Sequence, residues 1–300
     1  MAERLSFHDE IRNNKLKSII LIVIIFIFFI LLGFLISLAL DPSIFFIMMI
    51  FAIIFSLIYV VGSYYNSDKI ALASVNAKPA SHAEHKMLFH AVESMSLASG
   101  LPMPKVYVMN SEQINAFASG RDPEHAVICV TTGALNKLSK QELEGVIAHE
   151  MSHIANYDIR FMTLTAVLIG MVSIIAQLFL RNIWIARSDS DNKKGNAILF
   201  LIAIVASILA PIAAQLVSLA ISRKREFTAD ATGVKFTRSP TGLKSALGKI
   251  KDEHISENDK HRYPKAVAPL FIGDPYKKKF QDLLSTHPDV NERIRRLSLM

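Results

Sequence analysis

Four long stretches without a charged residue divide the sequence, and polar segments separate them. The first two run from Ser18 to Leu40 and from Ser43 to Ser67, joined by the short turn Asp41-Pro42. A membrane-spanning helix needs about 20 apolar residues, because each residue adds about 1.5 Å to a helix. Both stretches are long enough, and both exceed the apolar core of about 7–15 residues in a cleaved signal peptide. Residues 1–67 are therefore predicted to form an uncleaved membrane hairpin.

The other two uncharged stretches lie in the second half of the chain. They are Phe161–Leu180 and Asn196–Ser222, with the polar loop 181–195 between them. The simplest interpretation is two further spans, which gives about four transmembrane helices in all. Two glutamines and Pro211 interrupt the apolar pattern, and such residues are tolerated best where neighbouring protein covers them. A hairpin that is only partly embedded in the membrane is therefore the alternative.

The apolar stretches divide the chain into four predicted parts: a hairpin at 1–67, a polar part at 68–160, a second hairpin at 161–222 and a polar part at 223–300. Arg12, Lys15 and Lys17 precede the first span, whereas the turn after it has no basic residue. Basic residues favour the cytoplasmic side, which predicts that residues 68–160 are cytoplasmic. The basic loop 181–195 departs from this pattern. Because two spans separate the polar parts, both are expected on the same side.

Shorter patterns in the first polar part predict a small sheet and two helices. Runs rich in β-branched or aromatic residues predict strands at Lys105–Met109, Asn115–Ser119 and Ala126–Thr132. The sequences Ser81-x-x-Glu84 and Ser139-x-x-Glu142 match the capping box that begins a helix. Gly100 is predicted to end the first of these helices.

The helix that begins at Ser139 carries the pattern His-Glu-x-x-His, formed by His149, Glu150 and His153. Histidines at positions i and i+4 lie on one helical face, so both imidazoles can reach one metal ion. Two histidines with a further carboxylate and a glutamate base are the groups of a zinc hydrolase. The alternative is a polar helix face with two solvated histidines. Apolar residues on both sides of the motif argue against it, because polar groups in such a helix need partners.

A third ligand is expected after the fourth apolar stretch, where Glu226 and Asp230 share a helical face at i and i+4. Glu226 can bind the metal, and Asp230 can accept a hydrogen bond from the far nitrogen of His149. The alternative is a solvated helix start in which Arg223 and Arg225 are ion-pair partners. The even number of spans before Glu226 returns it to the side of the membrane that holds the two histidines.

Composition agrees with a membrane protein, since hydrophobic residues make up 51% of the chain. The formal net charge is +7. Basic residues beside membrane spans contact anionic headgroups, and without aromatic residues interleaved among them they do not indicate nucleic-acid binding. A single cysteine, Cys129, excludes an intramolecular disulfide and is expected to be a buried strand residue. Glycine is sparse and forms no phosphate-binding loop, so nothing supports ATP dependence.

The chain resembles the HtpX family of membrane zinc metalloproteases, relatives of the CAAX prenyl protease. The resemblance covers most of the chain and rests on these features in this order: the N-terminal hairpin, Pro104-Lys-Val-Tyr-Val108, Asn115-Ala-Phe-Ala118, Glu144 to His153, Glu226-Phe-Thr-Ala-Asp230, and Ser285-Thr-His-Pro288 followed by Arg293-Ile294. It implies a polytopic membrane protein with a gluzincin-like zinc protease domain, mainly α with a small β-sheet.

The resemblance also implies the roles of individual residues. His149, His153 and Glu226 are expected to bind one Zn²⁺ per chain, with Glu150 as catalytic base. The substrate-binding strand along the cleft is expected to comprise Asn115, Ala116, Phe117 and Ala118. A further donor should stabilise the oxyanion. His287 is the candidate, although it is equally placed to be a loop histidine near a helix cap, and Arg293 is expected to form a structural salt bridge.

The expected function is zinc-dependent hydrolysis of peptide bonds in damaged or misfolded membrane proteins near the cytoplasmic membrane surface. The expected location is the bacterial inner membrane, with the protease domain in the cytoplasm. Protein substrates and the lipid bilayer are the expected partners, and the sequence gives no oligomeric state. Two alternatives are a non-proteolytic scaffold with a structural metal and a mononuclear iron oxygenase. Structural zinc usually has four protein ligands, and a free Glu150 beside His149 favours a zinc hydrolase over both.

Overall fold

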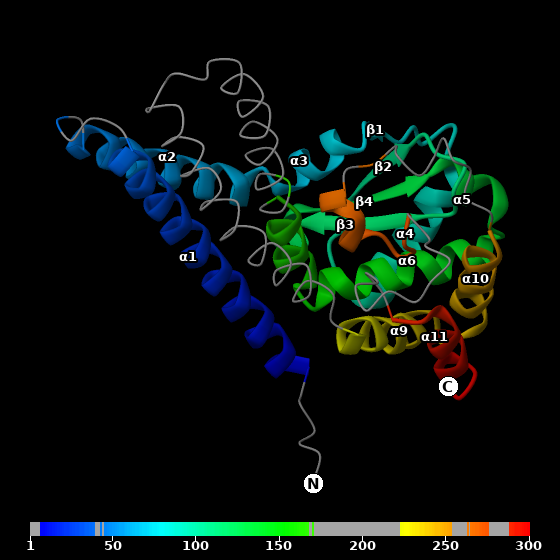
Figure 1. Cartoon of the computed structure of the whole chain (residues 1–300). Helices are drawn as coiled ribbons and strands as arrows, with labels where there is room; N and C mark the ends of the chain where they lie inside the picture. Colours follow the sequence, from blue (N-terminus) through cyan, green and yellow to red (C-terminus); the bar gives the residue numbers. More distant parts are fainter. Residues whose placement is uncertain are drawn as a thin grey trace, which may run out of the picture.

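The computed structural model shows a long helical hairpin joined to a domain in which helices surround a small sheet (Figure 1). The described residues are 7–39, 43, 45–167, 170, 223–253, 263, 265–275 and 288–300. Most of the two later apolar stretches, the loop 181–195 and His287 lie outside them. Within the described residues the fold is mainly helical with one four-stranded sheet, as predicted. The four-part division of the chain stays a prediction.

The hairpin consists of α1 (Phe7–Ala39) and α2 (Phe45–Tyr65). Two helical segments in the described part of the chain are long and apolar enough to cross a membrane, Ile11–Leu31 and Phe45–Tyr65. The helices approach closely at Gly33, where an added Cβ would lie 2.2 Å from the Cβ of Ala52. Small residues at such crossings are typical of membrane helix pairs.

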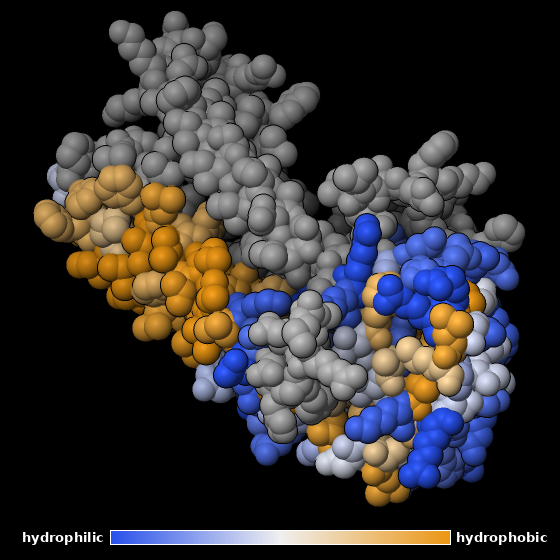
Figure 2. Space-filling model, turned by 90° about the horizontal axis from the view of Figure 1, so that it is seen from below, coloured by the Kyte–Doolittle hydropathy of each residue, from blue (hydrophilic) through white to orange (hydrophobic). Residues whose placement is uncertain are grey.

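The outward faces of this hairpin are apolar and exposed. Large side chains such as Ile27, Phe46 and Ile58 are more than half exposed. In Figure 2 the hydrophobic colouring is concentrated on this arm, whereas much of the domain surface is hydrophilic. An exposed apolar surface of this kind needs a partner, and for two helices of this length lipid is the physical match.

The sheet has the strand order β1-β2-β4-β3. Its strands are β1 (Lys78–Pro79), β2 (Lys105–Met109), β3 (Ala116–Gly120) and β4 (Ala126–Thr131). β4 pairs in parallel with β2 and antiparallel with β3, with Phe117 opposite Cys129. Three of the strands were predicted, and Cys129 is buried in β4 as expected. β3 lies at the edge of the sheet, so one side of its backbone is free of strand pairing.

Helices cover both faces of the sheet. The described helices of the domain are α3 (Ser67–Ser74), α4 (Lys86–Ser99), α5 (Thr132–Lys137), α6 (Lys140–Ala155), α9 (Arg223–Thr237), α10 (Thr241–Asp252) and α11 (Val290–Leu297), with short 3₁₀ turns η2 (Pro123–His125) and η3 (Lys265–Leu270). The main core lies between the sheet and α4, α6 and α10. A second core, on the other side, includes α3, η3 and Met162.

The predicted start of α4 was wrong. The helix begins at Lys86 rather than after Ser81, although Gly100 ends it in a left-handed conformation as expected. The backbone amide of Ser81 donates to the ring of His85 at 3.2 Å, and residues 82–84 form a turn. The expected capping box is therefore absent here, whereas the second box, at Ser139 and Glu142, is present at the start of α6.

Candidate metal centre

The centre is built on α6, which the capping box starts and which is buried over most of its length. His149 is 1% exposed and His153 is 4% exposed, so neither is a solvated surface histidine. Their side chains project from one face of the helix, and the two Nε2 atoms lie 3.2 Å apart. Two imidazole nitrogens this close, in a buried site, present two lone pairs to the same point.

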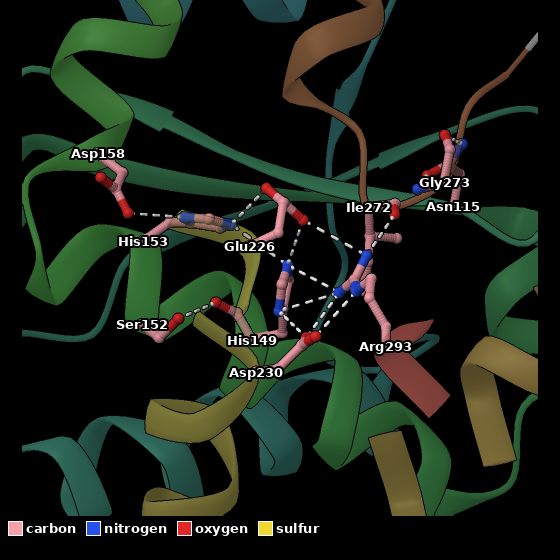
Figure 3. Close-up of polar contacts among 10 residues, drawn as sticks. All are labelled: Asn115, His149, Ser152, His153, Asp158, Glu226, Asp230, Ile272, Gly273 and Arg293. Carbon is pink, nitrogen blue, oxygen red and sulfur yellow. Dashed lines mark hydrogen bonds and ion pairs between the residues drawn. The ribbon is translucent and has the colours of Figure 1, made fainter. Parts of the chain in front are cut away.

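α9 supplies the carboxylates because it packs closely on α6 (Figure 3). Glu226, Asp230 and Gly233 stand at i, i+4 and i+7 and therefore share one face of α9. A Cβ added at Gly233 would lie 3.2 Å from the backbone nitrogen of His149. The missing side chain lets α9 lie against the helix that carries the histidines, which brings both carboxylates into the centre.

Three metal donors gather in the described part of the chain. Ligand atoms of His149, His153 and Glu226 all lie within 4.8 Å of one another. Glu226 Oε2 is 3.6 Å from His149 Nε2, and Glu226 Oε1 is 3.6 Å from His153 Nε2. Donors about 2.0–2.2 Å from one tetrahedral zinc ion are separated by about 3.3–3.6 Å, so the spacing fits zinc. The set of two imidazoles and one carboxylate also suits it.

A carboxylate that is not a metal donor contacts the Nδ1 atom of each histidine. His149 Nδ1 lies 3.0 Å from Asp230 Oδ1, and His153 Nδ1 lies 3.0 Å from Asp158 Oδ2. Donation from each Nδ1 leaves the Nε2 lone pair free for a metal, which is the usual arrangement behind metal-bound histidines. The contact of Asp230 with His149 was expected from the sequence, whereas the role of Asp158 was missed.

The same contacts change the pKa values of His149 and Asp230 in the metal-free centre. Burial and the nearby Arg293 charge oppose protonation of His149, but hydrogen bonds to Asp230 and Glu226 raise its pKa to about 9. Burial alone would raise the pKa of Asp230, but the charge and hydrogen bonds of Arg293, with those of His149, lower it to about 2. Asp230 is therefore ionised at neutral pH, as a carboxylate that orients a ligand must be.

Glu150 lies beside the donors without joining them. It is 1% exposed, and its Oε1 atom has no hydrogen-bond partner within the residues that the structure describes. Burial raises the pKa of its carboxyl group, and a hydrogen bond from the backbone of Ala118 in β3 opposes the shift. A buried carboxylate oxygen without a partner, next to a metal donor set, fits a group that exchanges protons with a bound molecule.

Of the predicted substrate strand, Ala116 to Ala118 form the start of the edge strand β3, and Asn115 directly precedes it. Part of its free edge is in contact with another segment of the chain. The backbone amide of Ile272 donates to the carbonyl oxygen of Ala116 at 3.0 Å. The side-chain amide of Asn115 donates to the carbonyl oxygen of Gly273 at 2.9 Å.

Arg293, from α11, is fully buried and forms the expected salt bridge. It contacts Asp230 through Nε at 2.9 Å and through Nη2 at 2.7 Å. Its Nη1 atom donates to the carbonyl oxygen of Ile272 at 3.2 Å and lies 3.4 Å from Glu226 Oε2. Arg293 thus connects the metal donors to the segment beside the edge strand. His287 is not among the described residues, so its role at this centre stays a prediction.

Comparison with known proteins agrees with the geometry. The model of Peptidase family M48 matches residues 82–300. The chain is 47% identical over 253 residues to a protease HtpX homolog of Caldanaerobacter subterraneus subsp. tengcongensis, covering 83% of this chain and 83% of the relative. It is 40% identical over 297 residues to a protease HtpX homolog of Dictyoglomus thermophilum, covering 98% of this chain and 95% of the relative.

A solved structure, that of S. mikatae Ste24p, aligns with 89% of this chain and 61% of its own, with a TM-score of 0.46 and 21% identity. The sequence relatives extend over nearly the whole chain, and the family model includes every residue of the donor set. The chain therefore belongs to peptidase family M48, among the HtpX-type membrane metalloproteases.

Proposed function

We propose that this metalloprotease is a zinc-dependent endopeptidase that cuts damaged or misfolded membrane proteins in segments close to the cytoplasmic membrane surface. One Zn²⁺ per chain would be held by His149, His153 and Glu226. When bound, zinc lowers the pKa of a water molecule and polarises the scissile carbonyl group. The spacing of the three donors supports this assignment.

Glu150 is the proposed general base. Its position beside the donors and its raised pKa suit a group that takes a proton from the attacking water and passes it to the leaving amine. Asp230 and Asp158 keep the two histidines oriented while this happens. His287 remains the proposed donor to the oxyanion.

The observation that carries the membrane-surface proposal is a short path from the membrane hairpin to the donors. The side chain of Asn14, in α1, donates to Asp158 Oδ1 at 2.7 Å, and Asp158 Oδ2 contacts the metal donor His153. Asn14 stands four residues before Ser18, where the uncharged stretch begins. On a helix that separation is about 6 Å. The donors therefore lie close to the level at which α1 would enter the bilayer.

The same end of α1 supports the proposed orientation in the membrane. Arg12, Lys15 and Lys17 lie beside the start of the first span, which favours a cytoplasmic position for this end and for the domain that contacts it. A substrate segment would add as a strand beside β3. Backbone hydrogen bonds supply much of the affinity in this mode, which favours broad sequence specificity.

The proposal is tested with a model membrane protein in which a cleavable segment is moved stepwise away from its span. Both proteins are reconstituted in vesicles, and the cuts are mapped for the parent enzyme and for Glu150→Gln. We expect cleavage to be restricted to positions near the span and to be absent in the variant. Equal cleavage of a segment tens of residues from the membrane would overturn the membrane-surface proposal.

A further inference from the structure

Asn14 lies in the polar first part of α1 but is not a surface residue. Its side chain is 5% exposed and makes two contacts with the turn that follows α6. Nδ2 donates to the backbone carbonyl oxygen of Asn156 at 3.0 Å and to Asp158 Oδ1 at 2.7 Å. An amide nitrogen carries two hydrogens, so both donors are used in these contacts.

Asp158 transmits the contact to the metal donors. It is 1% exposed, and while Oδ1 accepts from Asn14, Oδ2 lies 3.0 Å from His153 Nδ1. The two oxygens of one carboxylate are fixed relative to each other. A shift of the Asp158 side chain away from Asn14 would therefore also turn or lengthen its contact with His153.

The turn that carries Asp158 depends on α1 in a second way. Tyr157 has a φ of 59°, in the left-handed region that a residue other than glycine rarely adopts. Lys15 Nζ lies 4.2 Å from the centroid of the Tyr157 ring. Two successive residues of α1 thus contact residues 156–158, so the position of α1 and the shape of this turn are linked.

We propose that Asn14 is a positioning residue for the metal ligand His153, acting through Asp158. Retention of the metal then depends on how α1 is seated against the domain, and hence on the membrane hairpin. The contact requires a hydrogen-bond donor at position 14. This positioning role does not require that the protein hydrolyse peptides.

The test compares Asn14→Ala and Asn14→Asp with the matched control Asn13→Ala, all in the Glu150→Gln full-length protein. Removal of a direct partner of a metal-binding histidine weakens metal binding about 10–100-fold, so a residue one contact further away should accelerate chelator-driven zinc release about 3–10-fold. Asn14→Asp keeps the size but lacks the donor, and should release zinc at least as fast as Asn14→Ala. Asn13→Ala should match the parent.

Two further readouts separate positioning from general folding. The cobalt-substituted variants at position 14 should show an altered visible absorption spectrum. The loss of thermal midpoint should be larger with zinc present than with chelator present, because a weakened site loses part of the stabilisation that ligand binding supplies. Unchanged zinc release in Asn14→Ala, or an equal midpoint loss with and without zinc, would overturn the proposal.

A second inference rests on the contacts of the edge strand. Residues 271–273 contact residues 115–117 in reverse order, with Gly273 at Asn115, Ile272 at Ala116 and Phe271 at Phe117. The amide of Ile272 donates to the carbonyl oxygen of Ala116 at 3.0 Å, and Gly273 exchanges two hydrogen bonds with the side chain of Asn115. Next to these contacts, the rings of Phe271 and Phe117 lie 5.3 Å apart.

These contacts use the side of β3 that is not paired with β4, which is where an added peptide strand would bind. Ala118 faces the same side and contacts the carboxyl group of Glu150. The carbonyl oxygen of Ile272 accepts from Arg293 Nη1, which is also 3.4 Å from Glu226. The segment therefore lies on the free edge and next to the donors.

We infer that Phe271–Gly273 is an internal competitor for substrate, which an entering peptide must displace from the edge of β3. This inference rests on the proposed function, since it assigns the same edge to substrate. Proline has no amide hydrogen, so Ile272→Pro removes the bond to Ala116. One hydrogen bond of ordinary strength corresponds to about a 2–10-fold fall in the apparent KM for an extended peptide. Ile272→Val keeps the amide and should keep the parental KM.

Hydrogen exchange in the Glu150→Gln protein distinguishes a failure of this inference from a failure of the proposed function. The amide of Ile272 should be protected alone and should exchange faster when a saturating extended peptide is added. This measurement requires binding but no hydrolysis, so it remains informative if the protein cuts nothing. Continued protection of Ile272 in the peptide complex, or an unchanged KM in Ile272→Pro, would overturn the inference.

Discussion

Replacing Arg293 by alanine should destabilise the protein far more than replacing an exposed arginine in the same helix. The guanidinium group of Arg293 is fully buried and donates twice to Asp230, which is itself 2% exposed. It also bonds the carbonyl oxygen of Ile272. Arg293→Ala leaves an ionised carboxylate in the interior without its cationic partner, and leaves one buried carbonyl group with one bond fewer.

The magnitude follows from the loss of one partner of a buried ion pair, which costs about 3–5 kcal/mol. For a large domain each kcal/mol corresponds to about 2–4 °C, so the thermal midpoint should fall by about 6–20 °C. Arg293→Lys should recover only part of this loss, because one ammonium group cannot reproduce the two parallel bonds to Asp230.

Arg295→Ala is the matched control. Arg295 is in α11 and is ion-paired to Glu292 at 2.7 Å, but its side chain is 62% exposed. Exposed pairs contribute little, so its midpoint should stay within about 1–2 °C of the parent. The assay is thermal unfolding of detergent-purified protein in the Glu150→Gln background with zinc present. Equal midpoint losses for Arg293→Ala and Arg295→Ala would refute this account of the buried pair.

Three further outcomes are expected. Gly145→Ala should destabilise the protein strongly, because the added Cβ would lie 2.3 Å from the backbone nitrogen of Leu243. Gly248→Ala, where the added Cβ would meet nothing within 4 Å, should be neutral or slightly stabilising. Chemical unfolding of both variants checks this. In chelator-treated protein the pKa of His149 is raised to about 9, above its unfolded value of about 6.5. Protonation of His149 therefore stabilises the fold fully below about pH 6.5, and this stabilisation is lost as the pH rises through about 9. The thermal midpoint should fall over this pH range, and it should fall by less in Asp230→Ala. Asp230→Ala should also weaken zinc binding by about 10–100-fold, and an unchanged affinity in a competition titration with a chelator would count against its role. Because it leaves the buried Arg293 without this partner, it should lower the thermal midpoint as well.

The parts of the centre that the sequence predicted are those that depend on local spacing. The Ser139 capping box starts α6, and the i and i+4 positions place His149 and His153 together. The same spacing in α9 relates Glu226 to Asp230. The two predicted spans between α6 and α9 indicated that both helices lie on the same side of the membrane. No sequence pattern gives the distance between them, which depends on the absence of a side chain at Gly233.

The missed contacts depend on the tertiary fold. Asp158 comes five residues after His153 and beyond the end of α6, so helical spacing does not link them. The chain brings Asp158 back to the histidine through the left-handed conformation of Tyr157. Asn14 is more distant still, at 142 residues from Asn156 in sequence. The one signal for Asp158 was an acidic residue next to a long apolar stretch, where a charge needs a partner.

Zinc content and peptide hydrolysis, measured in the same preparations of the parent and of Glu150→Gln, test the assignment of the metal ligands and the catalytic base. Glu150 interacts through charge with all three donors but is not one of them. We expect about one zinc per chain in both proteins, in keeping with a single three-ligand site, and hydrolysis in the parent alone. A Glu150→Gln protein that hydrolyses peptide at the parental rate, or that has lost its zinc, would contradict the assignment of metal ligands and base.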